Sequence, residues 1–524
     1  MKLTGDVRRD FEKVSAAYTQ LKSRILEYQE TIKGLQRSLD NALESRKTQK
    51  ADYEQRLDEK EAIIKVLKNQ LEHELALKAH DGTNTGVPTS QTPIGKRKVI
   101  PNSRISTGRK KGGQPGHKRH VLEPPSDDEI DVVTAHELGA EDNCPRCCGQ
   151  NYVFTGEREA KYEIDIQVNV VKTRHEYYIY ECPDCGERFR TGIAPNLRAQ
   201  CQYGTMTQAM ALSLMDTVNA PINKVRTFLS GLTGGQIEPS EGYIAKLQLR
   251  AATALGTFME DLRLMLITRS LVYWDETVIM INKARGCLRF YGDETIAYYT
   301  AHLHKDMQSL DEDNVLALLT PGTSVMHDHN KVNYNEKYSF RNLECNQHLQ
   351  RDLQKSADDT RHPELLALKE LISKTIKDRK YLIAAGAEAF DDTYTACFES
   401  RLNDIIDQAE KANAEDFNTY FGQFEKNLIK RVLKYQDNYF AWVYDFSLPT
   451  TDNLSERALR SIKSHMKISG QFGSATTAGH FAKIKSYIET CRRNGINEIH
   501  ALTRLCEQDP YTVKEIFHPS HGSQ

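Results

Sequence analysis

An acidic pair interrupts an apolar run that otherwise has the pattern of a buried β-strand. The run "LVYWDETVIM" places Asp275 and Glu276 among aromatic and β-branched residues, which are the residue types enriched in strands. A carboxylate inside such a strand costs free energy unless a metal ion or hydrogen bonds compensate it. The segment therefore predicts a sheet that carries polar chemistry, and it limits the folds that the chain can adopt.

The neighbouring segments predict the rest of this sheet. "SLVYWDETVIMIN", "CLRFYGDE" and "IAYYTAHLH" have the pattern of three strands in an antiparallel meander, and "GTSVMHDHN" adds a further strand that ends at Asp328. With a helical stretch at 312–319 before that strand, this order predicts a ribonuclease-H-like α/β fold, in which metal-binding carboxylates lie on the first and fourth strands. The second acidic pair begins at Asp293, directly after Gly292 and between two strands, so it predicts a hairpin turn.

A third carboxylate is expected from the C-terminal part of the chain. In "PTTDNLSERALRSIKSHMKIS" a helix begins after Asp452 or Asn453 as N-cap, and Glu456 falls in its first turn. An alternative interpretation makes Glu456 only a capping-box partner of Asn453. A carboxylate followed by cations on one helix face suits a helix that completes a metal site and follows a phosphate backbone. These cations are Arg460, Lys463 and Lys467.

Two cysteine knuckles predict a zinc ribbon over residues 123–200. "NCPRCCG" and "ECPDCGERF" bracket "KYEIDIQVNVV", in which apolar residues alternate from Tyr162 to Val170 as in a half-buried strand. Four thiolates would hold one structural Zn²⁺, and the presence of two knuckles makes a redox pair at either one the weaker interpretation. Cys148 is an alternative to Cys147. The four predicted ligands are Cys144, Cys147, Cys182 and Cys185.

Residues 1–78 predict a coiled-coil oligomerisation helix. Apolar residues recur at alternating steps of three and four from Phe11 to Ala42, which is the seam of a left-handed coiled coil. The repeat resumes in a shifted register from Tyr53 to Leu71, as it would after an inserted stutter. A lone helix packed on its own body is the alternative, but a repeat of this length favours a partner helix and hence self-association.

Residues 79–122 predict a flexible basic arm, because Gly, Pro, Ser and Thr replace any hydrophobic period. The chain as a whole has a formal net charge of -2, yet this segment gathers cations with no acidic residue between them. Such a cluster predicts contacts with a phosphate backbone, and an inert solvated spacer is the alternative. The cations are Lys96, Arg97, Lys98, Arg104, Arg109, Lys110, Lys111, Lys118 and Arg119.

The remaining segments complete a multidomain α+β organisation. Three short helices are predicted over 201–255, an arrangement that permits a helix-turn-helix DNA reader. We expect the ribonuclease-H-like catalytic domain over 256–490 with a helical insertion at about 361–440, followed by a C-terminal tail over 491–524. No apolar run approaches the roughly 18 residues that span a bilayer, and the charged N-terminus lacks a signal-peptide core. These features predict a cytoplasmic, nucleoid-associated protein.

Several motifs, taken in order, give the chain a family resemblance. "KKGGQPGHKRH", the paired C-P-x-C knuckles, "DET" on a strand, "HDHNKVNYN" followed by "CNQH", and "DNLSERALR" with the later "SYIETCRRNGIN" occur here in an order that resembles transposases of the insertion-sequence family sixty-six. The resemblance covers nearly the whole chain. It implies an Asp-Asp-Glu catalytic triad of Asp275, Asp328 and Glu456, and it matches Cys345 and His348 to the C-x-x-H signature that follows the second Asp.

The same resemblance implies a DNA transposase that performs metal-dependent strand cleavage and strand transfer of a bacterial insertion sequence. The triad would hold two Mg²⁺ or Mn²⁺ ions about 3.5 to 4 Å apart. The expected partners are the DNA ends of the element, target DNA, further copies of the chain through the coiled coil, and helper proteins of the same element. The alternatives are a non-catalytic DNA-binding or regulatory relative that uses the zinc ribbon and the arm, and a coiled-coil scaffold protein.

Overall fold

The computed structural model divides the chain into two compact units. One unit comprises Met1–Ile100 with Asn346–Thr450, and the other comprises Pro101–Cys345 with Thr451–Gln524. The basic arm predicted at 79–122 lies outside the described residues, apart from its last position. The structure describes residues 7–45, 60–64, 66–67, 70–71, 74, 122–139, 141–416 and 419–518.

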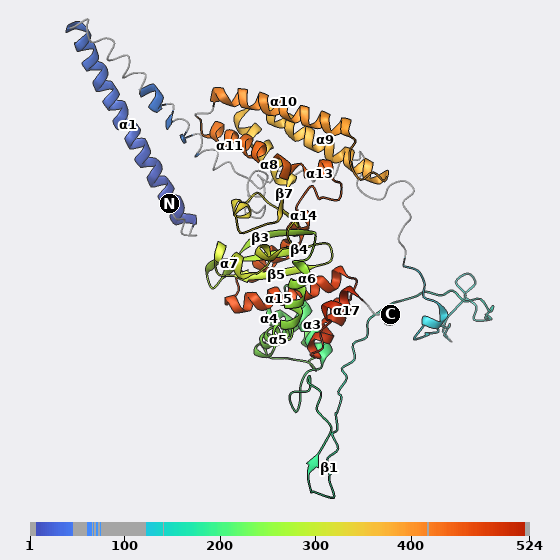
Figure 1. Ribbon diagram of the computed structural model, residues 1–524. Helices are drawn as coiled ribbons and strands as arrows, with labels where there is room; N and C mark the ends of the chain where they lie inside the picture. The colour runs from blue at the N-terminus through green and yellow to red at the C-terminus, as the bar shows by residue number, and fades with distance from the viewer. Residues whose placement is uncertain are drawn as a thin grey trace. The chain divides into compact units, whose positions relative to one another are not determined.

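The second unit is built on a five-stranded mixed sheet (Figure 1). Its first three strands form the predicted antiparallel meander, while β6 lies parallel to β3 and β7 lies parallel to β6. The strand order β5-β4-β3-β6-β7 is compatible with a ribonuclease-H-like core. The strands are β3 (Leu271–Ile281), β4 (Ala284–Gly292), β5 (Ala297–His302), β6 (Ser324–His327) and β7 (Arg341–Glu344).

Two tight turns set the register of the meander. β3 passes into β4 through Asn282 and Lys283, and both have the positive φ that a two-residue hairpin of this kind needs. At the other end of β4, a Cβ on Gly292 would lie 2.2 Å from the carbonyl oxygen of Ile296, so only glycine fits there. The Oδ1 atom of Asp293 accepts a hydrogen bond from the N–H of Ile296 at 2.7 Å. The prediction of a hairpin turn at the second acidic pair is confirmed.

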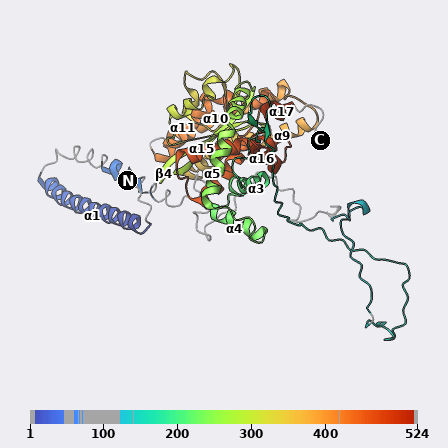
Figure 2. The same cartoon turned by 90° about the horizontal axis from the view of Figure 1, so that it is seen from below.

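Helices from both ends of the second unit share one apolar core with the sheet. The three helices predicted over 201–255 are present, but their buried side chains belong to the same cluster as those of β3, β4 and α15. They are therefore part of the sheet's own unit, and α3 lies beside α16 (Figure 2). The helices are α3 (Thr205–Asp216), α4 (Ile222–Leu232), α5 (Glu241–Ala254), α6 (Gly256–Leu266), α7 (Met307–Glu312), α14 (Asn453–Ser469), α15 (Ala475–Arg493), α16 (Glu498–Cys506) and α17 (Val513–Phe517).

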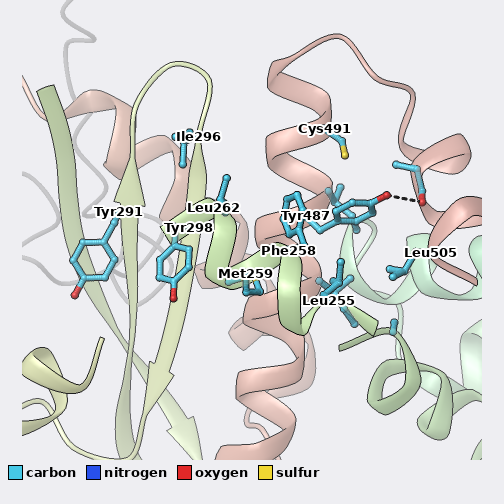
Figure 3. Packing of buried hydrophobic residues seen from close by; sticks show 14 of the residues in the cluster. Leu255, Phe258, Met259, Leu262, Tyr291, Ile296, Tyr298, Tyr487, Cys491 and Leu505 are labelled. Atoms are coloured by element: carbon cyan, nitrogen blue, oxygen red, sulfur yellow. Dashed lines mark hydrogen bonds between the residues drawn. The ribbon is translucent and has the colours of Figure 1, made fainter. Parts of the chain in front are cut away.

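The segment expected as a C-terminal tail is a structural part of this core. α16 buries Leu502 and Leu505, and α17 buries Ile516. Tyr487 links α15 to α16, since its hydroxyl donates to the carbonyl of Ala501 at 3.0 Å (Figure 3). The expectation of a tail over 491–524 is corrected for the described residues as far as 518, because apolar residues of α16 and α17 cover the core.

The first unit contains the helical insertion that the sequence predicts. Asn346 and Thr450 close its base, since the Asn346 N–H donates to the Thr450 carbonyl at 3.1 Å. The insertion is longer than the predicted range of about 361–440 because α8 already belongs to it. α9 and α10 run side by side (Figure 1). The helices are α8 (Asn346–Thr360), α9 (Glu364–Ala384), α10 (Asp392–Asp416), α11 (Tyr420–Lys434), α12 (Gln436–Tyr439) and α13 (Ala441–Tyr444).

The N-terminal segment forms the long helix α1 (Val7–Ser45). Phe11, Tyr18 and Tyr28 of the predicted seam are all more than half exposed. These side chains are available to a partner helix, although the single chain does not show self-association. Among the described residues, no helix combines the length and apolar character needed to cross a membrane.

The observed structure around the cysteine knuckles differs from the structure that the sequence pattern predicts. A short hairpin of β1 (Tyr180–Glu181) with β2 (Arg188–Phe189) flanks the second knuckle. The alternating run from Tyr162 to Val170 forms no strand, and Ile164 and Ile166 are 63% and 84% exposed. The strand prediction is wrong for this structure because alternation produces a strand only where a partner strand and a buried face are present.

Candidate active site

Of the predicted carboxylates, Asp275 lies within β3, and Asp328 directly follows the last residue of the parallel strand β6. β3 pairs with β6 so that Tyr273 lies opposite Met326. Asp275 and Asp328 each follow this pair by two positions, so the continued register places them side by side on one face of the sheet. Both are half-buried. Both acids lie close enough to Asp452, at the start of α14, to raise its pKa.

Glu276 points to the opposite face of β3 and belongs to a buried ion network. Its Oε2 lies 3.2 Å from Nε of Arg289, its direct neighbour across the strand pair, and its Oε1 lies 3.0 Å from Nζ of Lys305. Arg289 is only 1% exposed, and its Nη1 lies 3.2 Å from Oδ2 of Asp313. Tyr291 donates to the same Asp313 oxygen at 2.7 Å. The second acid of the pair is therefore compensated by protein cations and stabilises the sheet.

α14 carries the predicted third acid and the predicted cations. Its buried Leu459 and Ile462 pack the helix against β3 and β4. Glu456 lies in the first turn, and its Oε2 is 3.9 Å from Nη2 of Arg460. The side chains of Arg460, Lys463 and Lys467 are exposed, so they present a cationic face beyond the sheet.

Asp452 begins α14 and is held at the end of β7. Its N–H donates to Sγ of Cys345 at 3.3 Å, and the Cys345 N–H donates to the carbonyl of His327 at 3.1 Å. The Sγ atom of Cys345 also lies within 4.8 Å of a carboxylate oxygen of Asp328. Cys345 therefore acts as a positioning residue that fixes the start of α14 beside β6.

The carboxyl group of Asp452 is fully buried, and neither of its oxygens has a hydrogen-bond partner within the part of the chain that the structure describes. The side chain does not cap α14, and the Ser455 hydroxyl donates instead to the main-chain carbonyl of Asp452 at 3.0 Å. Burial raises the pKa of Asp452 well above its ordinary value, and nearby Asp275, Cys345 and Asp328 raise it further. Sequence reasoning offered Asp452 only as a helix cap, because no local pattern reveals its burial.

His329 and His348 each contact a side chain of their own unit. His329, which follows Asp328, places its Nδ1 2.8 Å from Oε1 of the buried Glu344. Tyr334 donates to the same oxygen at 2.5 Å. His348, the predicted partner of Cys345, lies on α8 in the other unit, where its Nε2 is 3.2 Å from Nη1 of Arg351.

The donor set of the acidic cluster suits a hard divalent cation. Asp275 and Asp328 offer carboxylate oxygens from neighbouring strands, and Mg²⁺ and Mn²⁺ prefer oxygen ligands. Asp452 adds a buried carboxyl group that the described protein atoms leave without a hydrogen bond. A bound cation would supply the compensation that such a group needs. These residues therefore fit the metal that the resemblance implies.

The two cysteine knuckles adopt the same turn. The Cys148 N–H donates to the Cys144 carbonyl at 2.8 Å, and the Gly186 N–H donates to the Cys182 carbonyl at 2.8 Å. Main-chain N–H groups, first those of Cys147 and Asp184 respectively, lower the pKa of the Cys144 and Cys182 thiols. In the described residues no three of the predicted ligands, which are Cys144, Cys147, Cys182 and Cys185, lie within reach of one ion.

The sheet order, with one acid within β3 and another directly after β6, defines a class of mixed α/β proteins that is compatible with a ribonuclease-H-like core. A family profile described as the transposase IS66 family matches residues 200–480, which is more than half of the 524 residues. The chain belongs to this family, as its motifs indicated. No curated protein matches the chain.

Proposed function

We propose that the protein catalyses divalent-metal-dependent cleavage and transfer of DNA strands. The observation that supports this proposal is the parallel pairing of β3 with β6, which would bring Asp275 and Asp328 side by side if the register continued past Tyr273 and Met326. Because α14 packs on the same sheet, its acid and its exposed cations belong to the same unit. Membership of a transposase family supports DNA as the substrate.

In this proposal the acids and the cations have different tasks. Asp275, Asp328 and Glu456 would hold two Mg²⁺ or Mn²⁺ ions, and bound ions would help to activate the attacking oxygen and to stabilise the leaving oxygen of a phosphodiester. Arg460 and the lysines of α14 bind backbone phosphates and hold the strand in place, since cations at phosphates position DNA without reading its bases. A cleavage assay on DNA that carries the ends of the element, with and without Mg²⁺, tests the proposal. Absence of cleavage by folded protein would favour the non-catalytic alternative, whereas cleavage without Mg²⁺ would contradict the metal-dependent mechanism.

The cationic face of α14 gives a prediction about salt dependence. Changing Arg460, Lys463 and Lys467 together to Gln should weaken binding to all DNA sequences alike. Each lost phosphate contact should reduce the magnitude of the slope of log K against log salt by roughly 0.9. Fluorescence anisotropy at several salt concentrations measures both quantities. Lys514 is an exposed cation on α17, so Lys514→Gln is the control and should leave the slope unchanged.

The cysteine knuckles support a second part of the proposal, a structural zinc ion that joins them. Their matching turns align Cys147 with Cys185, while Cys148 aligns with Gly186, and both of the latter residues have positive φ. This alignment favours Cys147 as the ligand. Lowered thiol pKa values also suit metal binding, because zinc is held by thiolates.

Zinc analysis of the purified protein checks this assignment. The wild type should carry about one zinc ion per chain. Cys147→Ser and Cys182→Ser should lose the metal, because each removes a thiolate of a four-ligand site. Cys148→Ser is the matched control and should retain zinc. Retention of zinc in Cys147→Ser together with its loss in Cys148→Ser would reverse the assignment.

Two further features of the sequence complete the proposed function. The basic arm, from Lys96 to Arg119, would add phosphate contacts outside the described residues. The exposed seam of α1 would pair with the same helix of a second copy. Both would help one assembly to hold two DNA ends, and helper proteins of the same element remain part of this proposal.

A further inference from the structure

A buried carboxyl group outside the proposed triad of Asp275, Asp328 and Glu456 lies close to Asp275 and Asp328. This extra group belongs to Asp452, four residues before Glu456 on the same helix. We propose that Asp452 is a fourth acidic ligand of the metal site and binds the divalent cation together with Asp275 and Asp328. The inference rests on the proposed function, because it assumes that the cluster holds such a cation.

The surroundings of Asp452 point to a ligand from outside the chain. Its side chain is 0% exposed, and within the described residues neither carboxyl oxygen has a hydrogen-bond donor. The charged groups that act on it most strongly are Asp275, Cys345 and Asp328, none of which is a cation. A buried carboxyl group in such surroundings is costly unless something compensates it. One cation placed beside these acids would compensate the buried carboxyl group of Asp452.

The backbone of Asp452 is fixed where such a ligand is needed. The Cys345 thiol accepts its N–H at 3.3 Å and lies within 4.8 Å of a carboxylate oxygen of Asp328. The side chain does not make the capping hydrogen bond that an Asp at this position usually makes. Ser, Thr and Asn cap helices equally well, so capping does not explain an acid here. A role as a metal ligand explains why this position carries an acid.

Titration of Mn²⁺ into the full-length protein by isothermal calorimetry tests this inference directly. Asp452→Asn should weaken Mn²⁺ binding by about 10-fold or more, at least the loss that follows removal of an outer-shell partner. The melting temperature of the metal-free variant should equal or exceed that of the wild type, because the amide replaces a buried acid. A purely structural role for Asp452 predicts the reverse, with lower metal-free stability and unchanged Mn²⁺ affinity.

Parallel variants separate this inference from the proposed function. If Asp275→Asn loses Mn²⁺ binding while Asp452→Asn keeps the wild-type affinity, only the role of Asp452 is refuted. If the wild type shows no binding that depends on Asp275, both proposals fail. Asp452→Ser, which retains a good N-cap residue, serves as a second variant and should also lose affinity. Failure of both Asp452 variants to fold would assign the residue a structural role and overturn the inference.

Discussion

Replacing Asp275 or Asp328 with asparagine will abolish DNA strand cleavage while leaving DNA binding close to that of the wild type. Each substitution removes a carboxylate, within β3 or directly after β6, but keeps the size of the side chain. Even the loss of an outer-shell partner of a metal ligand costs 10- to 100-fold, so we expect the cleavage rate to fall by at least about 100-fold. Phosphate contacts come from other residues, and the dissociation constant for DNA should change little.

Asp293→Asn is the matched control for this experiment, because it makes the same chemical change in the second "DET" of the chain. Asp293 accepts hydrogen bonds through Oδ1 in the turn after Gly292, and an asparagine oxygen can accept the same bonds. The control variant should therefore keep most of its activity. Wild-type cleavage by Asp275→Asn or by Asp328→Asn would remove that residue from the site.

The strands that carry or precede Asp275 and Asp328 were predictable, because the residue types next to each acid in the sequence indicate a strand. Aromatic and β-branched runs around Asp275 and Asp328 indicate strands, and glycine before Asp293 indicates a turn. The motifs, which occur in the same order as in the family, then indicated which fold these segments form. The same local reasoning failed at the alternating run from Tyr162 to Val170, where no partner strand is present.

Other features were not predictable because they depend on contacts between distant residues. Asp452 and Cys345 are separated in the sequence by the whole helical insertion. No pattern within a short stretch of sequence could therefore indicate the hydrogen bond between them. The role of Glu276 likewise depends on Arg289, which reaches it only after the hairpin sets the register. An acid in a strand therefore cannot be assigned to catalysis or to structure until its cross-strand neighbour is known.

The buried network around Glu276 leads to the prediction with the largest effect on stability. Arg289→Met should lower the free energy of unfolding of the second unit by about 3–5 kcal/mol, the usual cost of breaking a buried ion pair by removing one partner. The methionine fills much of the space, but it leaves Glu276 with only Lys305 as an ion-pair partner. It also leaves the 1%-exposed Asp313 without its arginine. Hydrogen exchange of peptides from β3 and β4, followed by mass spectrometry, measures the loss.

Lys305→Met provides the matched control, because Lys305 binds the same carboxylate from a half-exposed position. Exposed ion pairs contribute about 0–1 kcal/mol, so this variant should lose little protection. Equal losses in the two variants would contradict the assignment of the buried arginine as the main partner. Arg289→Met should reduce cleavage only as far as it reduces the folded fraction, whereas Asp275→Asn should remove cleavage from protein that remains folded. This contrast would distinguish the two adjacent acids of β3, because Asp275 is proposed to act in cleavage and Glu276 to stabilise the sheet.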